Sequence, residues 1–464
     1  MTDWLTLLPA VVAIAFVLWR KEVIVALILA VFTSEWLLGI NAGNASPFNG
    51  FIETAERVVG VFTDPGNARL LTFSALIGAL LAYMRISGGV SATVQLMINS
   101  GVATNARRTG VMTFVTGIVV FIESNLSVLT AGILSRGLFD RFKMSRERLA
   151  FIVDSTSAPI CILILLNAWG AFVLGLIAPY EMEQSAVSVL IATIPLNFYA
   201  LSTLAVVFYT VWTGKVYGPL ARMEASQQAR VEQAISAQVE EVEPGRSRDM
   251  LVPLAIMVGG MLCFMYWTGN GDILEGSGSK SVLYATLLAI SVSFIMLIRQ
   301  PKFTHRQLVD EGFKGIGEIL PLVSILLLSI ALGASVKELG TGIFISGLVA
   351  DYLPLFLVPA VIFLAGAFAS FTTGTSWGTF ALLVPIGIPI AINLNLPPSL
   401  MLAAVLGGGV FGDHCSPVSD TTAVSSLAAG CDILDHVETQ LPYALFCGGI
   451  TIVGYIIAGL IVTS

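Results

Sequence analysis

Polar residues that can bind a cation or a proton interrupt two apolar stretches of the chain. The stretch DSTSAPIC (154–161) holds Asp154, and the stretch GDHCSPVSDTT (412–422) holds Asp413. Each combines its carboxylate with hydroxyl side chains and a proline, and proline frees backbone carbonyls because it lacks an N–H and disrupts the preceding helical turn. Oxygen ligands of these kinds are what small hard cations prefer. Both stretches therefore predict an interrupted helix with an ion site.

The acidic residues within the apolar segments give the most specific prediction of function. A charged residue at the centre of a membrane helix costs about 2.5–3.5 kcal/mol on insertion scales. Glu123, Asp154, Asp413 and Asp420 have no Lys or Arg within their own segments. Such a group is stable there with either a proton or a cation bound, so we expect Na⁺ and protons to exchange at Asp154 and Asp413.

Two further polar segments complete the candidate site. ESNLS (123–127) and TTGTSWG (372–378) supply oxygens and helix ends within apolar surroundings. His414 and Trp377 are candidates for a proton relay or a substrate gate, although a histidine beside an aspartate can also serve only as its hydrogen-bond partner. The candidate ion- and proton-binding residues are Glu123, Ser124, Asn125, Asp154, Ser155, Ser157, Thr373, Thr375, Ser376, Asp413, Ser416, Asp420 and Thr421.

Other polar residues have simpler interpretations. Small residues such as Ser425 and Ser426 often only allow close packing of membrane helices. Cys415 is expected to be a small packing residue. The remaining acidic residues and the second histidine near these segments are expected in solvated cytoplasmic loops: Asp140, Glu147, Asp432, Asp435, His436 and Glu438.

The elements that must position these residues are membrane helices. Of the 464 residues, 56% are hydrophobic and only 11% are charged, whereas a soluble domain has about 25% charged residues. The N-terminal segment lacks the basic start and small-residue cleavage site of a signal peptide, so we expect it to be the first spanning helix. The composition predicts an all-α, multi-pass protein of the cytoplasmic (inner) membrane, with the lipid bilayer as its surroundings and no nucleic-acid partner.

Two of the apolar segments are interrupted too severely to cross lipid as one helix. The segments around FIESNLSVLTAG (121–132) and FASFTTGTSWGTF (368–380) fit re-entrant hairpins, whose irregular backbone is tolerated only when buried in protein or lining a cavity. Basic residues flank the first on both sides, so it opens to the cytoplasm. The second has no flanking basic residue and opens outward.

The distribution of basic residues gives the orientation. Ten crossings and two hairpins, with both termini outside, place nearly all of the 23 Lys and Arg residues on the cytoplasmic side. The exceptions are Arg57, Arg69, Lys280 and Lys337.

The two halves of the chain echo each other. In each half a hairpin with a polar tip is followed by a polar helix break. The two halves are expected to have opposite orientations in the membrane, and one charged segment separates them. Two inverted repeats of this kind, each of about five transmembrane helices plus one hairpin, are typical of secondary transporters with unwound helices at the bilayer midplane. The expected divisions are a first repeat (1–214), a charged cytoplasmic linker (215–249) and a second repeat (250–464).

The run GDHCSPVSDTT (412–422) resembles the signature of the NhaC-type sodium/proton antiporter family, within the wider ion transporter superfamily. The ESNLS tip, the DSTSAP stretch and the chain length are similar to that family over essentially the whole chain. The resemblance implies inverted repeats with unwound helices, a homodimer with a scaffold and a moving transport domain, and Na⁺/H⁺ exchange or coupled transport of an organic solute. It also implies that a tip such as Ser124–Asn125 helps to bind Na⁺.

Two functions remain open from the sequence. The first is a Na⁺/H⁺ antiporter, with Na⁺ and H⁺ as transported or coupling ions and no other cofactor. The second is a Na⁺- or H⁺-coupled transporter of a small organic acid or amino acid, favoured by the amides, hydroxyls and the Trp377 indole beyond what a bare ion needs. An intramembrane hydrolase using Asp413, His414 and Cys415 is disfavoured because adjacent residues point in different directions, and an ATP-driven pump because there is no P-loop. A channel fits less well than alternating access.

Overall fold

The computed structural model describes residues 3–20, 22–44, 46–89, 91–93, 96, 104–121, 124–164, 166–230, 245–272, 276–417 and 419–464. Side chains are not described at positions 3, 17, 18, 126, 130, 134, 227–230, 350 and 420. The described part is all-helical, and eight of its helices are long and apolar enough to cross a membrane, or up to ten if two bent helix pairs each count as one span. The chain is therefore built as a multi-pass membrane protein.

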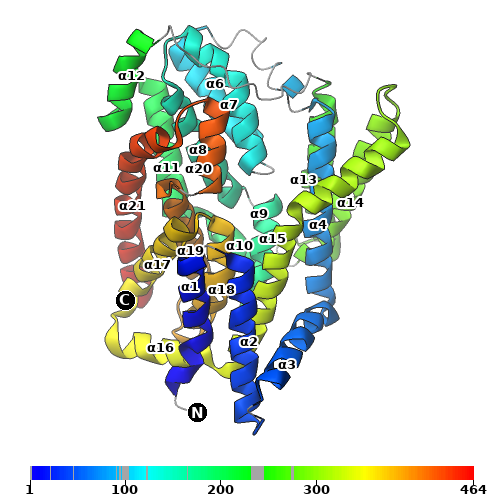
Figure 1. The fold of residues 1–464 in the computed structure, drawn as a ribbon, viewed down its shortest axis with the longest axis vertical. Helices are drawn as coiled ribbons and strands as arrows, with labels where there is room; N and C mark the ends of the chain where they lie inside the picture. Colours follow the sequence, from blue (N-terminus) through cyan, green and yellow to red (C-terminus); the bar gives the residue numbers. More distant parts are fainter. Residues whose placement is uncertain are drawn as a thin grey trace.

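Long helices on one side of the molecule form a group around α4 and α15 (Figure 1). Helix α15 packs against α4 and α2, while α14 packs against α4 and α13. These helices and their neighbours are α1 (Leu8–Arg20), α2 (Val23–Asn41), α3 (Pro47–Gly60), α4 (Pro65–Ile86), α13 (Arg248–Thr268), α14 (Gly278–Ile298), α15 (His305–Leu339) and α16 (Thr341–Tyr352).

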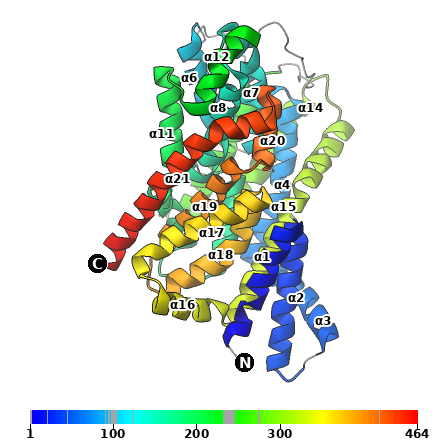
Figure 2. The ribbon, with the colours of Figure 1, turned by 60° about the vertical axis from the view of Figure 1, so that its left-hand side comes forward.

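The remaining helices form the part of the molecule that carries the candidate residues. They are α6 (Ala106–Val119), α7 (Ser124–Arg141), α8 (Arg146–Leu163), α9 (Ala168–Ile177), α10 (Ala186–Ala192), α11 (Phe198–Thr213), α12 (Gly218–Arg230), α17 (Val358–Thr373), α18 (Ser376–Asn393), α19 (Pro398–Cys415), α20 (Asp420–Ala429) and α21 (Ile433–Thr463). Figure 2 shows α17, α19 and α21 as neighbouring helices, and all three pairs are in contact.

Helices α6 and α7 pair as an antiparallel hairpin, as do α17 and α18. Thr113 Oγ1 donates to Ser135 Oγ (2.9 Å), and nearer the tip Ser127 Oγ donates to the carbonyl of Gly117 (3.2 Å). In the second hairpin, Gly374 ends α17 in the left-handed region (φ +70°), where glycine carries no steric penalty. The hydroxyl of Thr375 then accepts the Gly378 N–H at the start of α18.

The prediction of a helix break at 154–161 is wrong, because α8 continues to Leu163. Hydroxyls satisfy carbonyls in the turns before Pro159: Thr156 Oγ1 donates to the Ile152 carbonyl (2.7 Å), and Ser157 Oγ donates to the Asp154 carbonyl (3.2 Å). Neither carbonyl is that of Ser155, which Pro159 leaves without its N–H partner. The helix nevertheless continues past its proline, which membrane helices tolerate where neighbouring protein surrounds them. Helix α8 ends at Leu163, and α9, which begins at Ala168, lies at an angle of 46° to it.

The second interruption lies within the expected stretch. Helix α19 ends at Cys415 and α20 begins at Asp420, with the hydroxyl of Ser419 accepting the Thr422 N–H as the cap of α20. Four residues, 416–419, therefore separate two helices in the middle of GDHCSPVSDTT.

The lengths of the helices repeat at a fixed spacing along the chain. Helices α7, α8 and α9 have 18, 18 and 10 residues, as do α18, α19 and α20. Their first residues are 124, 146 and 168 in one set and 376, 398 and 420 in the other, so each pair is 252 residues apart.

The charged segment between the halves begins with a helix. Glu224 on α12 forms an ion pair with Arg148 at the start of α8 (2.9 Å) and accepts the Ser145 N–H (3.0 Å). Residues 231–244 of the expected linker lie outside the described residues.

Candidate functional site

Asp413 lies in the last turn of α19, beside the tip of the second hairpin and the start of α20. Its side chain is completely buried. Ser376 Oγ, from the first residue of α18, donates to Asp413 Oδ2 at 2.7 Å, and Thr421 Oγ1 donates to the same oxygen at 3.3 Å. A hairpin tip and both ends of a broken helix thus meet at one carboxylate.

The backbone around this carboxylate is also held by side-chain hydroxyls. Ser416 Oγ donates to the carbonyl of Phe371 in α17 (2.7 Å), and Thr422 Oγ1 donates to the carbonyl of Asp413 (3.5 Å). The last carbonyls of a helix have no partner within the helix and form the negative end of its dipole. The end of α19 therefore offers carbonyl oxygens and a favourable potential for a cation.

Asp154 lies in the interior of α8 and has a different set of partners. Its side chain is also completely buried. Gln440 Nε2 donates to Asp154 Oδ2 at 2.6 Å, and His436 Nε2 lies 3.5 Å from the same oxygen. Both partners come from α21, on one face of that helix because they are four residues apart.

The prediction that His436 lies in a solvated loop is wrong. Helix α21 begins at Ile433 and carries His436 into the interior, where its side chain has no exposed surface. The buried residues of DILDHVETQ (432–440) are polar, namely His436, Thr439 and Gln440, so an apolar pattern does not mark this first part of α21.

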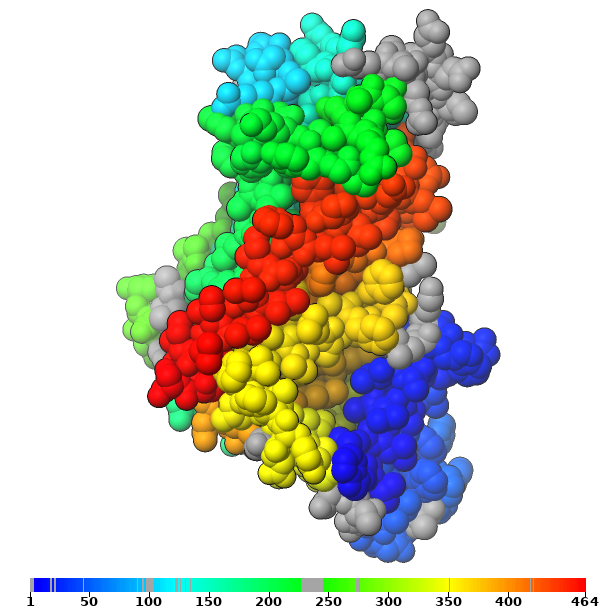
Figure 3. Space-filling model, turned by 90° about the vertical axis from the view of Figure 1, so that its left-hand side faces the viewer, coloured from blue at the N-terminus to red at the C-terminus, as the bar shows by residue number. Residues whose placement is uncertain are grey.

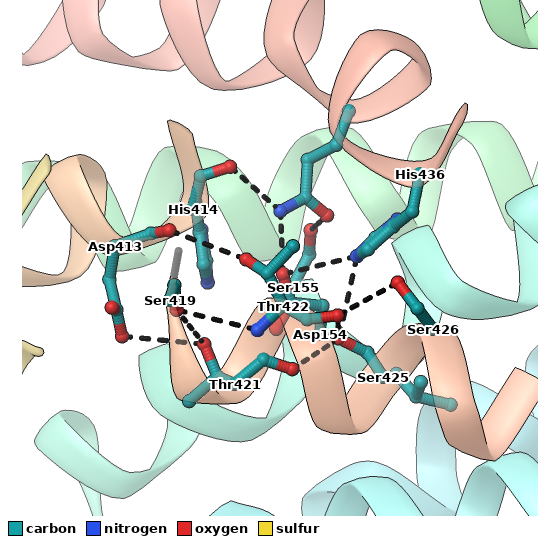
Figure 4. A network of polar contacts seen from close by, with 12 residues as sticks. Asp154, Ser155, Asp413, His414, Ser419, Thr421, Thr422, Ser425, Ser426 and His436 are labelled. Carbon is teal, nitrogen blue, oxygen red and sulfur yellow. Dashed lines mark hydrogen bonds and ion pairs between the residues drawn. The ribbon is translucent and has the colours of Figure 1, made fainter. Parts of the chain in front are cut away.

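A chain of polar contacts connects the two carboxylates (Figure 4). Ser425 Oγ on α20 donates to the Thr421 carbonyl and lies 3.4 Å from His436 Nε2, which in turn contacts Asp154. The Thr421 carbonyl cannot pass on a proton, so the groups that can transfer one are the Ser425 hydroxyl and the His436 imidazole beside Asp154. The network is closed to solvent, because every one of these side chains is buried.

His414 faces away from Asp413 and contacts Tyr199. The Tyr199 hydroxyl lies 2.9 Å from His414 Nδ1, and both side chains are buried. Gln440 Nε2 also donates to the His414 carbonyl at 3.0 Å. His414 therefore joins α19 to α11 through its ring and to α21 through its backbone.

The other predicted residues lie around this centre in different roles. Ser155 Oγ is 3.5 Å from Gln440 Oε1, and Thr373 Oγ1 is 3.5 Å from the Ser370 carbonyl. Ser124 is buried at the start of α7, and Asn125 follows it. Glu123 and the side chain of Asp420 lie outside the described residues.

Trp377 belongs to a cluster of aromatic rings between α9 and α18. Its ring centroid lies 4.6 Å from that of Trp169 and 4.8 Å from that of Phe172. Trp169 is buried, and the first hairpin reaches the same region, since Asn167 Nδ2 donates to the Phe121 carbonyl at 3.0 Å. The start of α9 thus contacts both hairpins.

Sequence reasoning missed Tyr199, Thr422, His436 and Gln440, and it assigned Ser425 to helix packing although its hydroxyl lies 3.4 Å from His436 Nε2. The spacing of His436 and Gln440 was the available signal, because residues four apart lie on the same face of a helix. This spacing would have indicated a shared helix face only if the start of α21 had been placed at Ile433.

Residues 160–460 match the model of a protein family described as the Na⁺/H⁺ antiporter family. An uncharacterised protein of Haemophilus influenzae is 30% identical over 98% of this chain and 90% of its own length. Two relatives match over shorter stretches. The arginine/ornithine antiporter ArcD of Halobacterium salinarum is 34% identical over 32% of each chain, and the malate-2H⁺/Na⁺-lactate antiporter of Bacillus subtilis is 34% identical over 22% of this chain and 24% of its own.

A solved structure has a similar fold. The YdaH transporter of Alcanivorax borkumensis superposes with a TM-score of 0.56, covering 89% of this chain and 88% of its own, at 13% sequence identity. At this identity the similarity concerns the fold alone.

Proposed function

The chain belongs to the Na⁺/H⁺ antiporter family, and from this premise we propose that it exchanges Na⁺ for protons at the buried carboxylate Asp413, with the buried carboxylate Asp154 as a second proton-carrying group. Membership of this family makes it a secondary transporter of the antiporter type. The finer proposal concerns which groups bind the ions and how they are coupled.

The observation that carries the proposal is the set of donors at Asp413. Ser376 and Thr421 contact its carboxylate through hydroxyls, and a hydroxyl can rotate its hydrogen away and offer a lone pair instead. The same three side chains can therefore hold a proton-bearing carboxyl in one state and ligate Na⁺ through oxygen in the other. The carbonyl-rich end of α19 favours the cation electrostatically.

Asp154 is the second carboxylate of the exchange. Its contact with His436, and the contact of His436 with Ser425, support a route by which a proton leaves or reaches the site when Na⁺ binds or departs. Because both carboxylates are buried, leaving either ionised without a partner is costly. Binding of one ion is therefore linked to release of the other.

We also propose that the two halves are inverted repeats. The constant spacing of 252 residues between α7, α8, α9 and α18, α19, α20 supports this arrangement, as does the presence of one hairpin and one broken helix in each half. Alternating access then follows from movement of the hairpins and broken helices against the other helices around a central site.

Flux in proteoliposomes tests the proposed function. Protein reconstituted into vesicles with an internal pH-sensitive dye should move protons when a Na⁺ gradient is imposed, with no organic solute present. A K⁺ gradient of equal size serves as the control for osmotic and diffusion effects. No proton movement in response to Na⁺ without added solute would contradict Na⁺/H⁺ antiport.

A coupled transporter of an amino acid or organic acid is the second candidate. The cluster of Trp377, Trp169 and Phe172 beside the hairpin tip supports it, because aromatic faces bind organic solutes better than bare ions. Two relatives are antiporters of arginine/ornithine and of malate and lactate. A thermal-shift screen of these solute classes separates the two candidates: stabilisation by one solute only with Na⁺ present favours the carrier.

A further inference from the structure

The side-chain amide of Gln440 bridges Asp154 and the end of the broken helix α19. Its Nε2 lies 2.6 Å from Asp154 Oδ2 and 3.0 Å from the carbonyl oxygen of His414. Both neighbours are hydrogen-bond acceptors, so the amide must present its NH₂ group to them. Its own oxygen faces Ser155 Oγ at 3.5 Å.

The two oxygens that Gln440 bridges are suitable ligands for a cation. One belongs to a buried carboxylate, and the other is a carbonyl in the last turn of α19, where carbonyls have no partner within the helix. An NH₂ group that donates to both takes the position between them that a cation would take. In this respect Asp154 differs from Asp413, whose contacts with Ser376 and Thr421 are made through hydroxyls that can turn into ligands.

We propose that Gln440 keeps Asp154 from binding Na⁺ and so limits each chain to one Na⁺, held at Asp413. This inference rests on the proposed function and assigns Gln440 as a residue that determines ion stoichiometry. The NH₂ group cannot be a ligand, so before Na⁺ could bind there the amide would have to break two hydrogen bonds, one of them to a charged acceptor, whether it moved away or turned its own oxygen inward.

The surroundings of Gln440 would complete a second site if the NH₂ group were replaced by oxygen. Ser155, Tyr199 and His414 surround Gln440 and leave no space for a water molecule between them, so a cation could only take the position of the NH₂ group itself. In a Gln440→Glu variant, the new carboxylate, Asp154, the His414 carbonyl and the Ser155 hydroxyl would provide oxygens around one position.

Counting bound Na⁺ on the purified full-length protein tests the inference. Equilibrium binding of ²²Na⁺ should give one ion per chain in the wild type, none in Asp413→Asn, and one in Asp154→Asn. Gln440→Glu should bind two ions per chain, and the double variant Asp413→Asn with Gln440→Glu should bind one. Gln440→Ala, which uncovers both oxygens without adding charge, is a second variant should Gln440→Glu fold poorly, and it should also bind more than one ion.

The chain offers a matched control. Gln300 Nε2 donates to the buried carboxylate of Asp249 at 2.9 Å, away from the site. Gln300→Glu should leave the count at one. Loss of Na⁺ binding in Asp154→Asn, or a count of one in both Gln440 variants, would overturn the inference while leaving antiport intact. A wild type that binds no Na⁺ would overturn the proposed function and the inference together.

Discussion

Asp413 and Asp154 are both fully buried, but their neighbours suit them to different tasks. Asp413 is contacted by the hydroxyls of Ser376 and Thr421, whereas Asp154 is contacted by an amide and an imidazole. A buried charge is costly unless its partners compensate it. Hydroxyls allow this compensation to alternate between a proton and a cation, which is why we propose that exchange occurs at Asp413.

Removing one of these hydroxyls should weaken Na⁺ binding. Ser376→Ala deletes the 2.7 Å contact with Asp413 and one oxygen ligand. At about 1.4 kcal/mol for such an interaction, the Kd for Na⁺ should rise about tenfold. Titration of purified protein with ²²Na⁺ measures this change.

Ser291 provides the control for that variant. Its hydroxyl donates only to the preceding turn of α14 on an exposed face, so Ser291→Ala should leave the Kd unchanged. An unchanged Kd in Ser376→Ala would remove this serine from the ion site.

At the residue scale the sequence identifies acids more readily than their partners. Asp154 and Asp413 are recognisable because carboxylates in apolar segments without a nearby Lys or Arg are rare. His436 and Gln440 are not, because they come from a turn of α21 whose exposed face is acidic and resembles a loop. Which partner faces which acid depends on packing between helices distant in sequence.

Two helix sets of equal length carry the site, yet their chemistry differs. At the spacing of 252 residues, Cys161 corresponds to Asp413 and Ser124 to Ser376. Cys161 Sγ contacts the Phe121 carbonyl of the first hairpin (3.4 Å), whereas Asp413 Oδ2 accepts a hydrogen bond from Ser376 Oγ at the second (2.7 Å). Similar backbones therefore hold a carboxylate in only one of the two equivalent positions.

Close packing of α17 against α19 should be essential to the position of Asp413. A methyl group at Gly408 would meet the Phe363 carbonyl of α17. Gly408→Ala should therefore force the helices apart, destabilise the fold by about 1–3 kcal/mol and weaken Na⁺ binding. Thermal unfolding of the purified variant and its Na⁺ titration measure both effects.

Gly449 on α21 is the matched control, because a methyl group there would have no neighbour within 4 Å. Gly449→Ala should unfold at the wild-type temperature. Equal stability of the Gly408 and Gly449 variants would show that α17 and α19 do not depend on this contact.

At the element scale, the sequence predicts the hairpins and the second break but misplaces the first. Gly374 and the polar tips mark turns directly. Pro159 does not mark a helix end, because it removes only one backbone hydrogen bond and α8 continues to Leu163. Whether a proline ends a membrane helix depends on the protein packed around it, which the local sequence does not specify.

The whole molecule brings its two halves into one interior. Helix α7 of the first half packs along α20 of the second, and Arg136 Nη2 donates to the Leu427 and Ala428 carbonyls at the end of α20 (both 2.7 Å). Helix α21 crosses the outer surface (Figure 3), where its exposed side chains include Leu445 and Phe446. Its apolar outer face suits lipid, while its inner face carries Gln440.

Orientation in the membrane is testable by labelling. Asn44→Cys and Lys215→Cys place single thiols at exposed positions expected on opposite sides. Cys263, which is exposed, and Cys431, which is partly exposed, are first replaced by serine, and the other cysteines are buried. In intact cells a membrane-impermeant maleimide should label the Asn44→Cys variant only, and both variants after permeabilisation. Labelling of the Lys215→Cys variant in intact cells would reverse the orientation.

Composition and basic residues predict a multi-pass helical protein because both properties are set by the surrounding membrane. These properties do not predict that α7 and α20 lie side by side. In that contact Arg136 donates to the carbonyl of Leu427, which is 291 residues away, and a backbone carbonyl leaves no signal in the sequence.

The central claim is that a proton and Na⁺ exchange at Asp413. The most direct measurement is proton release from purified protein in weakly buffered solution when NaCl is added, with choline chloride as the reference salt. The wild type should release protons on addition of Na⁺, and folded Asp413→Asn should release none. Release of the same number of protons by Asp413→Asn, or no release by the wild type, would contradict the account.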